Sequence, residues 1–234
     1  MIVAIDGPAG SGKSTVAHEI ARRRGLTYLD TGAMYRSVAL ECLEHDVDLT
    51  DEAAVADVAR AMDISFVQDG DVQRVVVNGA DVTEAIRTAR VDQNVSVVSA
   101  VPEVRVAMVA LQRAVGEKDS VVAEGRDIGT AVYPNAEVKV FLTADAAARA
   151  HRRAVQREGG DADKADERVD ADEERKILAD IERRDRIDST RKASPLVAAD
   201  DAVHIDSSNL SVDEVCRRIE RLIDDAQARG GAHA

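Results

Sequence analysis

The sequence contains no tryptophan, only two phenylalanines and three tyrosines, and fewer basic than acidic residues. Its 31 Lys and Arg against 44 Asp and Glu give a formal net charge of −13 at pH 7. Such a charge repels a phosphate backbone, and so few aromatic rings offer little surface on which bases can stack. We therefore expect no nucleic acid polymer as a partner, although local arginines can still form a positive pocket for a small anion.

Cysteine is scarce and long apolar runs are lacking. Cys42 and Cys216 belong to no Cys-x-x-Cys or Cys/His group, so the sequence predicts neither a disulfide framework nor a zinc site. The longest apolar runs have about five residues, whereas a membrane helix needs roughly 20. The amino terminus has no basic and apolar regions of a secretory signal. We expect a cytoplasmic protein that contacts no membrane, and a monomer.

Short apolar segments alternate with longer helical patterns along the chain. This alternation is typical of βαβ units with a parallel sheet, and strands that are apolar on both faces indicate helices on both sides. We predict an α/β fold of the P-loop NTPase type, with a five-stranded parallel sheet flanked by helices. The predicted strands are Ile2–Ile5, Leu26–Leu29, Val121–Ala123, Val138–Leu142 and Ala202–Ile205.

Three segments depart from this alternation. Residues 64–79 read as strand, turn, strand and a second turn at Asn78-Gly79, which predicts an antiparallel meander. We therefore place a small inserted β subdomain at residues 62–85, between core segments 1–61 and 86–229. Residues 158–172 are poor in apolar side chains and predict a mobile lid loop, and residues 230–234 predict a disordered tail.

A glycine-rich segment follows the first predicted strand directly. It reads Gly-Pro-Ala-Gly-Ser-Gly-Lys-Ser and leads into a helical run, which is the spacing and context of a Walker A loop. Its backbone N–H groups can converge on phosphate oxygens, Lys13 can neutralise β/γ-phosphate charge, and Ser14 can ligate Mg²⁺. An ordinary glycine-rich turn is the alternative. We predict an ATP site formed by Gly7, Pro8, Ala9, Gly10, Ser11, Gly12, Lys13, Ser14 and Thr15.

A Walker A loop alone does not separate kinases from other nucleotide-binding proteins. The chain lacks the Asp-x-x-Gly and Asn-Lys-x-Asp motifs that a GTPase of the usual kind needs. Hydrolases and motors typically need a longer chain. These comparisons favour a P-loop kinase over a switch or a binding module.

Conspicuous residues follow the second and third predicted strands. These segments read Asp-Thr-Gly-Ala-Met-Tyr-Arg, ending at Arg36, and Glu-Gly-Arg-Asp-Ile-Gly, which contains Arg126. Ligands of open α/β sheets bind beyond the carboxyl ends of the strands. Arg36 and Arg126 are therefore candidates to bind the phosphate of an acceptor, with surface salt bridges as the alternative.

Two helical patterns further along carry arginines. The first has four at i, i+3, i+4 and i+8 on one face leading into the predicted lid: Arg149, Arg152, Arg153 and Arg157. They are candidates to stabilise charge on a migrating phosphoryl group, and a solvated basic face is the alternative. The second pattern, at i, i+4 and i+7, taken alone indicates an intrahelical ion pair: Arg184, Asp188 and Arg191.

Residues 7–14, 30–36, 124–130 and 184–196 together resemble the bacterial cytidylate kinase family. Two motifs in this order are quite specific for that family: Asp-Thr-Gly-Ala-Met-Tyr-Arg and Gly-Arg-Asp-Ile-Gly-Thr. The resemblance covers nearly the whole chain. The meander at 62–85 matches the insertion in the acceptor-binding region of that family. The resemblance implies transfer of the γ-phosphate of ATP to CMP or dCMP.

The resemblance also implies roles for individual residues. The substrate set comprises Thr31, Arg105, Asp127 and Arg191 around the cytosine, Ser96, Arg184 and Asp188 at the pentose, Arg36 and Arg126 at the phosphate, and Tyr35. A carboxylate at Asp127 accepts from the cytosine amine, whereas uracil has no donor there, so UMP should be disfavoured. Ser96 and Thr31 have local backbone hydrogen bonds or caps as alternatives.

The implied chemistry needs no general base, because a phosphate monoester oxygen is already largely ionised near pH 7. We expect positioning and charge neutralisation by catalytic residues Lys13, Arg126, Arg153 and Arg184, with Arg149 and Arg153 at the ATP. Glu124, where the family often has Asp, would orient magnesium-bound water beside Ser14, with a structural cap as the alternative. Other acceptors (UMP, AMP or shikimate) and a non-catalytic nucleotide-binding module remain open.

Overall fold

A computed structural model describes residues 1–70, 72–157 and 170–231 of the 234-residue chain. The chain divides into two compact units. The first contains Met1–Leu29, Val115–Thr190 and Ser194–Ala234, and the second contains Asp30–Ala114 and Arg191–Ala193. The second unit is thus larger than the insertion predicted at residues 62–85, because the helices on either side of the meander belong to it.

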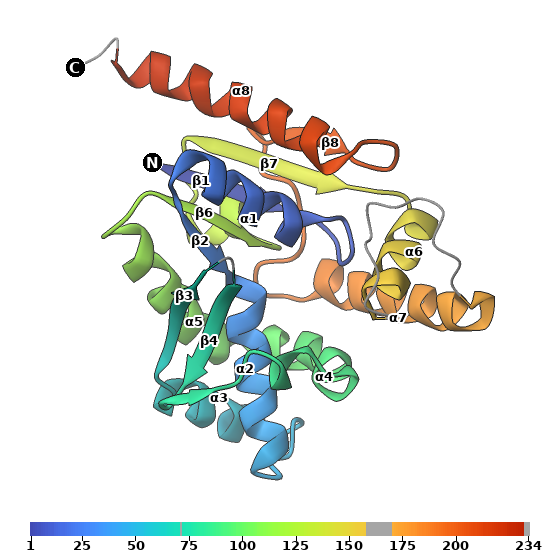
Figure 1. Ribbon diagram of the computed structural model, residues 1–234. Coiled ribbons are helices and arrows are strands. Elements are labelled where there is room, and N and C mark those ends of the chain that lie inside the picture. The colour runs from blue at the N-terminus through green and yellow to red at the C-terminus, as the bar shows by residue number, and fades with distance from the viewer. Residues whose placement is uncertain (71, 158–169, 232–234) are drawn as a thin grey trace. The chain divides into compact units, whose positions relative to one another are not determined.

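The sheet of the first unit has five strands in the order β2-β6-β1-β7-β8 (Figure 1). They are β1 (Ile2–Asp6), β2 (Thr27–Asp30), β6 (Val121–Gly125), β7 (Val138–Thr143) and β8 (Val203–Asp206). β1 pairs in parallel with both β6 and β7, and β7 pairs in parallel with β8. All five predicted strands and the predicted fold class are confirmed. The register sets Glu124 beside Ile5, so β1 and β6 end together at the same edge of the sheet.

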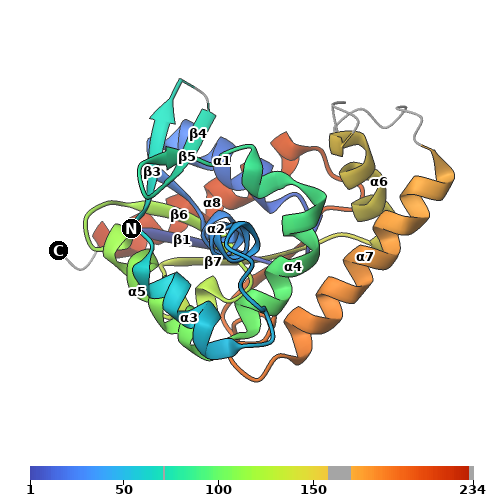
Figure 2. The same ribbon diagram turned by 90° about the horizontal axis from the view of Figure 1, so that it is seen from below.

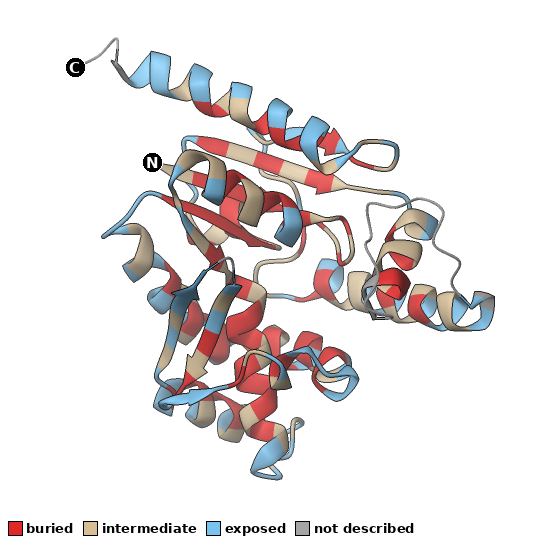
Figure 3. Cartoon of the chain, in the orientation of Figure 1, coloured by how far each residue is buried: buried red, intermediate tan, exposed pale blue. Residues whose placement is uncertain are grey.

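Helices α1 (Lys13–Arg24) and α8 (Val212–Gly231) pack their apolar side chains against this sheet. Ile20 of α1 and Ile219 of α8 are fully buried, and Figure 3 shows the buried stripe on each helix. Burial of each such side chain stabilises the fold by about 1.5 to 3 kcal/mol. Because α8 continues to Gly231, the predicted tail is wrong at residues 230 and 231, and residues 232–234 lie outside the described range.

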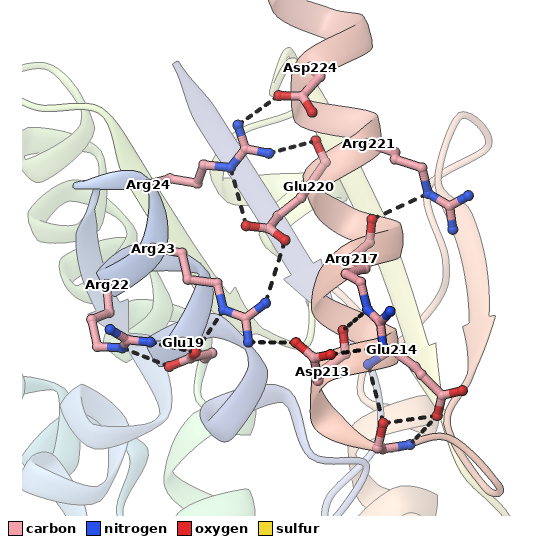
Figure 4. A network of polar contacts seen from close by, with 11 residues as sticks. Glu19, Arg22, Arg23, Arg24, Asp213, Glu214, Arg217, Glu220, Arg221 and Asp224 are labelled. Atoms are coloured by element: carbon pink, nitrogen blue, oxygen red, sulfur yellow. Dashed lines mark hydrogen bonds and ion pairs between the residues drawn. The ribbon is translucent and has the colours of Figure 1, made fainter.

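An ion-pair network also joins α1 to α8 (Figure 4). Arg23 contacts Glu19 at 2.7 Å, Asp213 at 2.9 Å and Glu220 at 3.5 Å, while Arg24 contacts Asp224 at 2.6 Å. Hydrogen bonds from the neighbouring arginines lower the pKa of Glu19 to about 2. The network is partly solvated, so salt weakens it, but it fixes the end of the helix that begins at Lys13.

Helices α6 (Ala146–Arg157) and α7 (Ala171–Thr190) lie side by side in the first unit (Figures 1 and 2). Their contact is apolar: Ala150 and Ala154 of α6 pack against Ile177 and Ile181 of α7. The small alanines let the two helices approach closely. Of the predicted lid loop, residues 158–172, positions 158–169 lie outside the described residues. Its last two residues, 171 and 172, belong to α7.

The second unit combines helices with a small antiparallel sheet. Its helices are α2 (Thr31–Glu44), α3 (Glu52–Ala61), η1 (Ala85–Arg87), α4 (Ala89–Ala100) and the greater part of α5 (Pro102–Gly116). Strands β3 (Ile64–Asp69), β4 (Val72–Val77) and β5 (Ala80–Asp81) form the predicted meander. Asn78 and Gly79 have positive φ angles of 50° and 83°, as a tight hairpin turn requires.

Within the described ranges, no single helix has both the length and the apolar character to cross a membrane, and α4 and α5 meet that test only together, as a pair bent by 97°.

Candidate active site

The Walker A segment forms a turn between β1 and the amino terminus of α1. Gly7 has a φ of 152°, and a Cβ there would lie 2.0 Å from the carbonyl oxygen of Leu142. Gly12, with a φ of 88°, precedes the first residue of α1. Only glycine tolerates both conditions, so the backbone can turn its N–H groups toward the helix amino terminus, where anions bind.

A cavity of about 130 Å³ lies at this turn, inside the first unit. The predicted residues Lys13, Ser14, Thr15, Arg153 and Arg184 all line it. Its remaining lining comes from the loop residues Ala9 to Gly12, from Val16, from Arg152 and Ile181, and from the start of α8 and the loop before it: Ser207, Leu210, Val212 and Val215. Basic groups and apolar side chains therefore share one cavity, which suits a nucleotide with its charged and apolar parts.

Lys13 is the most constrained cation of the cavity. It is 5% exposed, and its Nζ donates to the carbonyl oxygen of Pro8 at 2.7 Å. Burial, and next the charge of Arg126, lowers the pKa of Lys13 from 10.5 to about 7. The free energy cost of its buried charge is thus high, and a bound anion would reduce it.

Arg152 and Arg149 lie on the same helix but have different partners. Arg152 donates to the hydroxyl of Ser207 at 3.1 Å and to its carbonyl at 2.7 Å, at the rim of the cavity. Arg149 is not among the lining residues. Its Nη1 donates to the carbonyl of Ala9 at 2.9 Å and to Asp185 at 2.5 Å, against the outer side of the loop backbone.

The carboxyl end of β6 carries the predicted Glu124, Arg126 and Asp127. Glu124 is 5% exposed and accepts a hydrogen bond from the hydroxyl of Tyr28 at 2.8 Å. Arg126 donates from Nε to Asp188 at 2.9 Å, which joins two residues that the sequence assigned to the acceptor. Asp127 is also buried, at 4% exposure.

Asp6 supports this segment from the end of β1. Its carboxylate accepts hydrogen bonds from the backbone N–H groups of Ile128 and Gly129, each at 2.7 Å. Burial raises the pKa of Asp6 to about 6, in spite of these two hydrogen bonds. One carboxylate therefore connects the strand that precedes the Walker A loop with the turn that follows Arg126.

The second unit contains most of the other predicted acceptor residues. Arg36 forms an ion pair with Asp92, which is 6% exposed. The guanidinium of Arg105 lies 5.4 Å from the ring centre of Tyr35 and donates to the carbonyl of Ser99 at 3.3 Å.

Ser99 also meets a second predicted arginine. Its hydroxyl accepts from Arg191 at 3.5 Å and donates to the carbonyl of Ser96 at 3.1 Å. Thr31, the first residue of α2, is buried at 3% exposure. Within this unit, the predicted residues Ser96, Arg105 and Arg191 thus gather around one serine.

Several polar residues of these clusters were missed from the sequence. Asp92 and Ser99 share a face of α4 with the predicted Ser96, at i, i+4 and i+7, so helical spacing was an available signal. Asp185 and Tyr28 gave no such signal, because their partners Ala9 and Glu124 lie far away in sequence.

The described residues suit a magnesium ion that takes most of its ligands from the bound nucleotide and from water. They contain no cluster of three or more His, Cys, Asp or Glu side chains that could hold a metal by themselves. Mg²⁺ in phosphate-transfer sites usually takes one or two protein oxygens, with phosphates and waters as its other ligands. The Ser14 hydroxyl in the cavity and the Glu124 carboxylate at the neighbouring strand end are oxygens of this kind.

Comparison with known proteins shows the family to which the chain belongs. The family model described as "Cytidylate kinase" matches residues 3–225. A cytidylate kinase from Rhodococcus jostii is 46% identical over 233 residues, covering 98% of this chain and 97% of the relative. Another from Bacillus subtilis is 45% identical over 222 residues, covering 95% and 96%. A solved structure of an uncharacterized protein from Eubacterium ventriosum, 16% identical, covers 96% of this chain and 98% of its own with a TM-score of 0.51, and supports the fold alone. The chain belongs to the cytidylate kinase family.

Proposed function

We propose that the protein transfers the γ-phosphate of ATP to CMP or dCMP, giving ADP and CDP or dCDP. The observation that carries this proposal is the Walker A cavity, in which Lys13, Arg153 and Arg184 face one volume, in a chain of the cytidylate kinase family. Cations gathered around a phosphate-binding turn suit a reaction whose transition state spreads negative charge over phosphoryl oxygens.

On the donor side, the backbone N–H groups of the loop would bind the ATP phosphates. Lys13, Arg153 and Arg184 would neutralise charge as the phosphoryl group moves. The apolar residues Leu210, Val212 and Val215 would contact the less polar part of the nucleotide. Mg²⁺, held by Ser14 and Glu124, would neutralise phosphate charge when bound.

On the acceptor side, Arg36 and Arg126 would bind the phosphate of CMP. Arg105, Asp127, Arg191 and Thr31 would recognise the cytosine, with Tyr35 beside Arg105. The pentose would contact Ser96, Arg184 and Asp188. The proposal is supported by the burial of Arg105 and Asp127, since buried polar groups discriminate strongly between bases that pair with them and bases that do not.

No general base is proposed. The attacking group is a phosphate oxygen that is already largely ionised near pH 7, so alignment and charge neutralisation are the tasks of the protein. Cytoplasmic localisation and a monomeric state also remain predictions. Size-exclusion chromatography with light scattering measures the oligomeric state.

The test is an ADP-release assay with ATP and Mg²⁺ against CMP, dCMP, UMP, AMP and shikimate. We expect turnover with CMP and dCMP and much lower kcat/KM with the others. Preference for another acceptor would identify a different small-molecule kinase, and ATP binding without turnover of any acceptor would indicate a nucleotide-binding module. Lys13→Met, which removes the cation from the cavity, is the control for contaminating kinases.

A further inference from the structure

One residue of the Walker A loop has both of its backbone polar groups bound by an ion pair from α6 and α7. The N–H of Ala9 donates to Asp185 at 3.3 Å, and its carbonyl accepts from Nη1 of Arg149 at 2.9 Å. Asp185 and Arg149 contact each other at 2.5 Å. We call this arrangement of Ala9, Arg149 and Asp185 the Ala9 clamp.

The Arg149 side chain is largely enclosed by protein. It is 9% exposed, and its buried Nε has no hydrogen-bond partner among the described residues. The hydrogen bonds described for this guanidinium are those of Nη1, to Ala9 and Asp185. The backbone of α6 also packs on the loop: a Cβ on Gly10 would lie 3.1 Å from both the Cβ and the carbonyl oxygen of Arg149.

Asp185 lies on α7 between two residues with roles in the proposed reaction. Arg184, directly before it, lines the cavity, and Asp188, one turn later, binds Arg126. A change in how α7 meets the loop would therefore move Arg184 relative to the phosphates. Reaction rates depend steeply on such placement, since a shift of about 1 Å can cost about 100-fold.

We propose that Asp185 is a positioning residue for the phosphate-binding loop, and that Arg149 acts with it by fixing Ala9 rather than by binding ATP phosphates. This inference rests on the proposed use of ATP and assigns a role to Asp185 that the sequence pattern does not reveal. Asp185 touches neither nucleotide and acts through the backbone of Ala9.

The competing arrangement makes the opposite prediction. If Asp185 only holds Arg149 until a triphosphate takes the guanidinium, removal of its charge would release Arg149 and strengthen ATP binding. In the clamp, the same removal leaves a buried guanidinium without its counter-charge and loosens the loop, so ATP binding weakens.

The experiment compares Asp185→Asn, Arg149→Met and the double variant with wild type. Asp180→Asn is the matched control, because Asp180 lies on the same helix and forms a surface ion pair with Arg183 at 3.5 Å. The readouts are the Kd of the Mg²⁺ complex of the imido analogue of ATP by calorimetry, KM for ATP and for CMP, Tm, and hydrogen exchange of residues 7–12.

We expect Asp185→Asn to raise the Kd and the KM for ATP about 10- to 100-fold and to change KM for CMP by a smaller factor, because Arg184 and Asp188 of the same helix are assigned to the pentose. Exchange at Ala9 should accelerate, and the double variant should lose less than the product of the two single losses, because both act through one contact. Asp180→Asn should match wild type. Tighter analogue binding in Asp185→Asn, or a lower Tm with unchanged Kd, would overturn the proposal.

A second variant and an acceptor-free titration allow the clamp to be tested even if Asp185→Asn does not fold or CMP is not the acceptor. If Asp185→Asn does not fold, Asp185→Glu keeps the charge but lengthens the side chain, and the same loss of analogue affinity is expected. The analogue titration needs no acceptor, so it judges the clamp even if wild type fails to phosphorylate CMP, an outcome that would refute the proposed acceptor alone.

Discussion

Because Lys13 is buried beside the phosphate-binding turn, we expect the affinity for ATP to fall as pH rises above 7. Burial lowers the pKa of Lys13 to about 7 in the ligand-free protein. A triphosphate beside Nζ favours the charged form, so binding must be accompanied by protonation of any neutral Lys13. Above pH 7 this protonation works against binding, and the apparent affinity should fall.

The size of the effect follows from the protonated fraction. With a pKa of about 7, Lys13 is about one half protonated at pH 7 and about one hundredth protonated at pH 9. If only the charged form binds, the affinity for ATP falls about 50-fold over this range, which corresponds to about 2.3 kcal/mol. Near pH 8, each binding event should take up close to one proton.

Calorimetry with the Mg²⁺ complex of the imido analogue, from pH 6.5 to 9 in buffers of different ionisation enthalpy, measures both quantities. Lys13→Met is the matched control, because it fills the same volume without a titrating group. It should bind more weakly at every pH but show only the titration of the ligand itself. Equal pH slopes in wild type and Lys13→Met, or no proton uptake by wild type at pH 8, would refute the reasoning.

Three further predictions concern residues around the strand ends. The Asp6 carboxyl ionises near 3.8 when unfolded and near 6 when folded, so the contribution of Asp6 to stability is greatest below pH 3.8 and falls by up to about 3 kcal/mol as pH rises from 3.8 through 6. Asp6→Asn should lack this component in urea titrations from pH 4 to 7. Tyr28→Phe removes the hydrogen bond to Glu124 and should raise the Mn²⁺ concentration needed for half-maximal nucleotide binding several-fold, without changing KM for CMP; an unchanged metal requirement would argue against a metal role of Glu124. Asp127→Asn should narrow the kcat/KM ratio of CMP to UMP by about 10-fold or more, and an unchanged ratio would exclude base recognition at that position.

Local patterns were sufficient for the elements that position the phosphate-binding turn. The strands of the first unit are short and apolar, and each is followed by a helix or a glycine turn, so their order and type could be predicted. The boundaries of the second unit could not, because α2 to α5 join it by tertiary packing that no local pattern reveals. The prediction of a disordered tail was wrong at residues 230 and 231. There α8 continues through two glycines, a residue type with low helix propensity.

Helical spacing predicted that several arginines share a face, but it did not predict their partners. Arg149, Arg152 and Arg153 were expected to act together on a phosphoryl group. Arg152 and Arg153 line the cavity, with Arg152 bound to Ser207, whereas Arg149 does not line it and binds the loop backbone. Arg152 and Arg153 are adjacent and so differ in direction by about 100°, and even residues on one broad face can bind different partners.

Arginines assigned to phosphates in the sequence recur in the structure with aspartate partners, and this explains how an acidic chain can bind anions. Each aspartate neutralises a guanidinium that would otherwise carry an unpaired, poorly hydrated charge, a change that typically costs about 3 to 5 kcal/mol when one partner is removed. An aspartate bound at Nε or one Nη leaves other N–H donors of the guanidinium for a ligand. The carboxylates therefore orient the cations without consuming them, and the net charge of −13 is compatible with two anionic substrates. The pairs are Arg36 with Asp92 and Arg126 with Asp188.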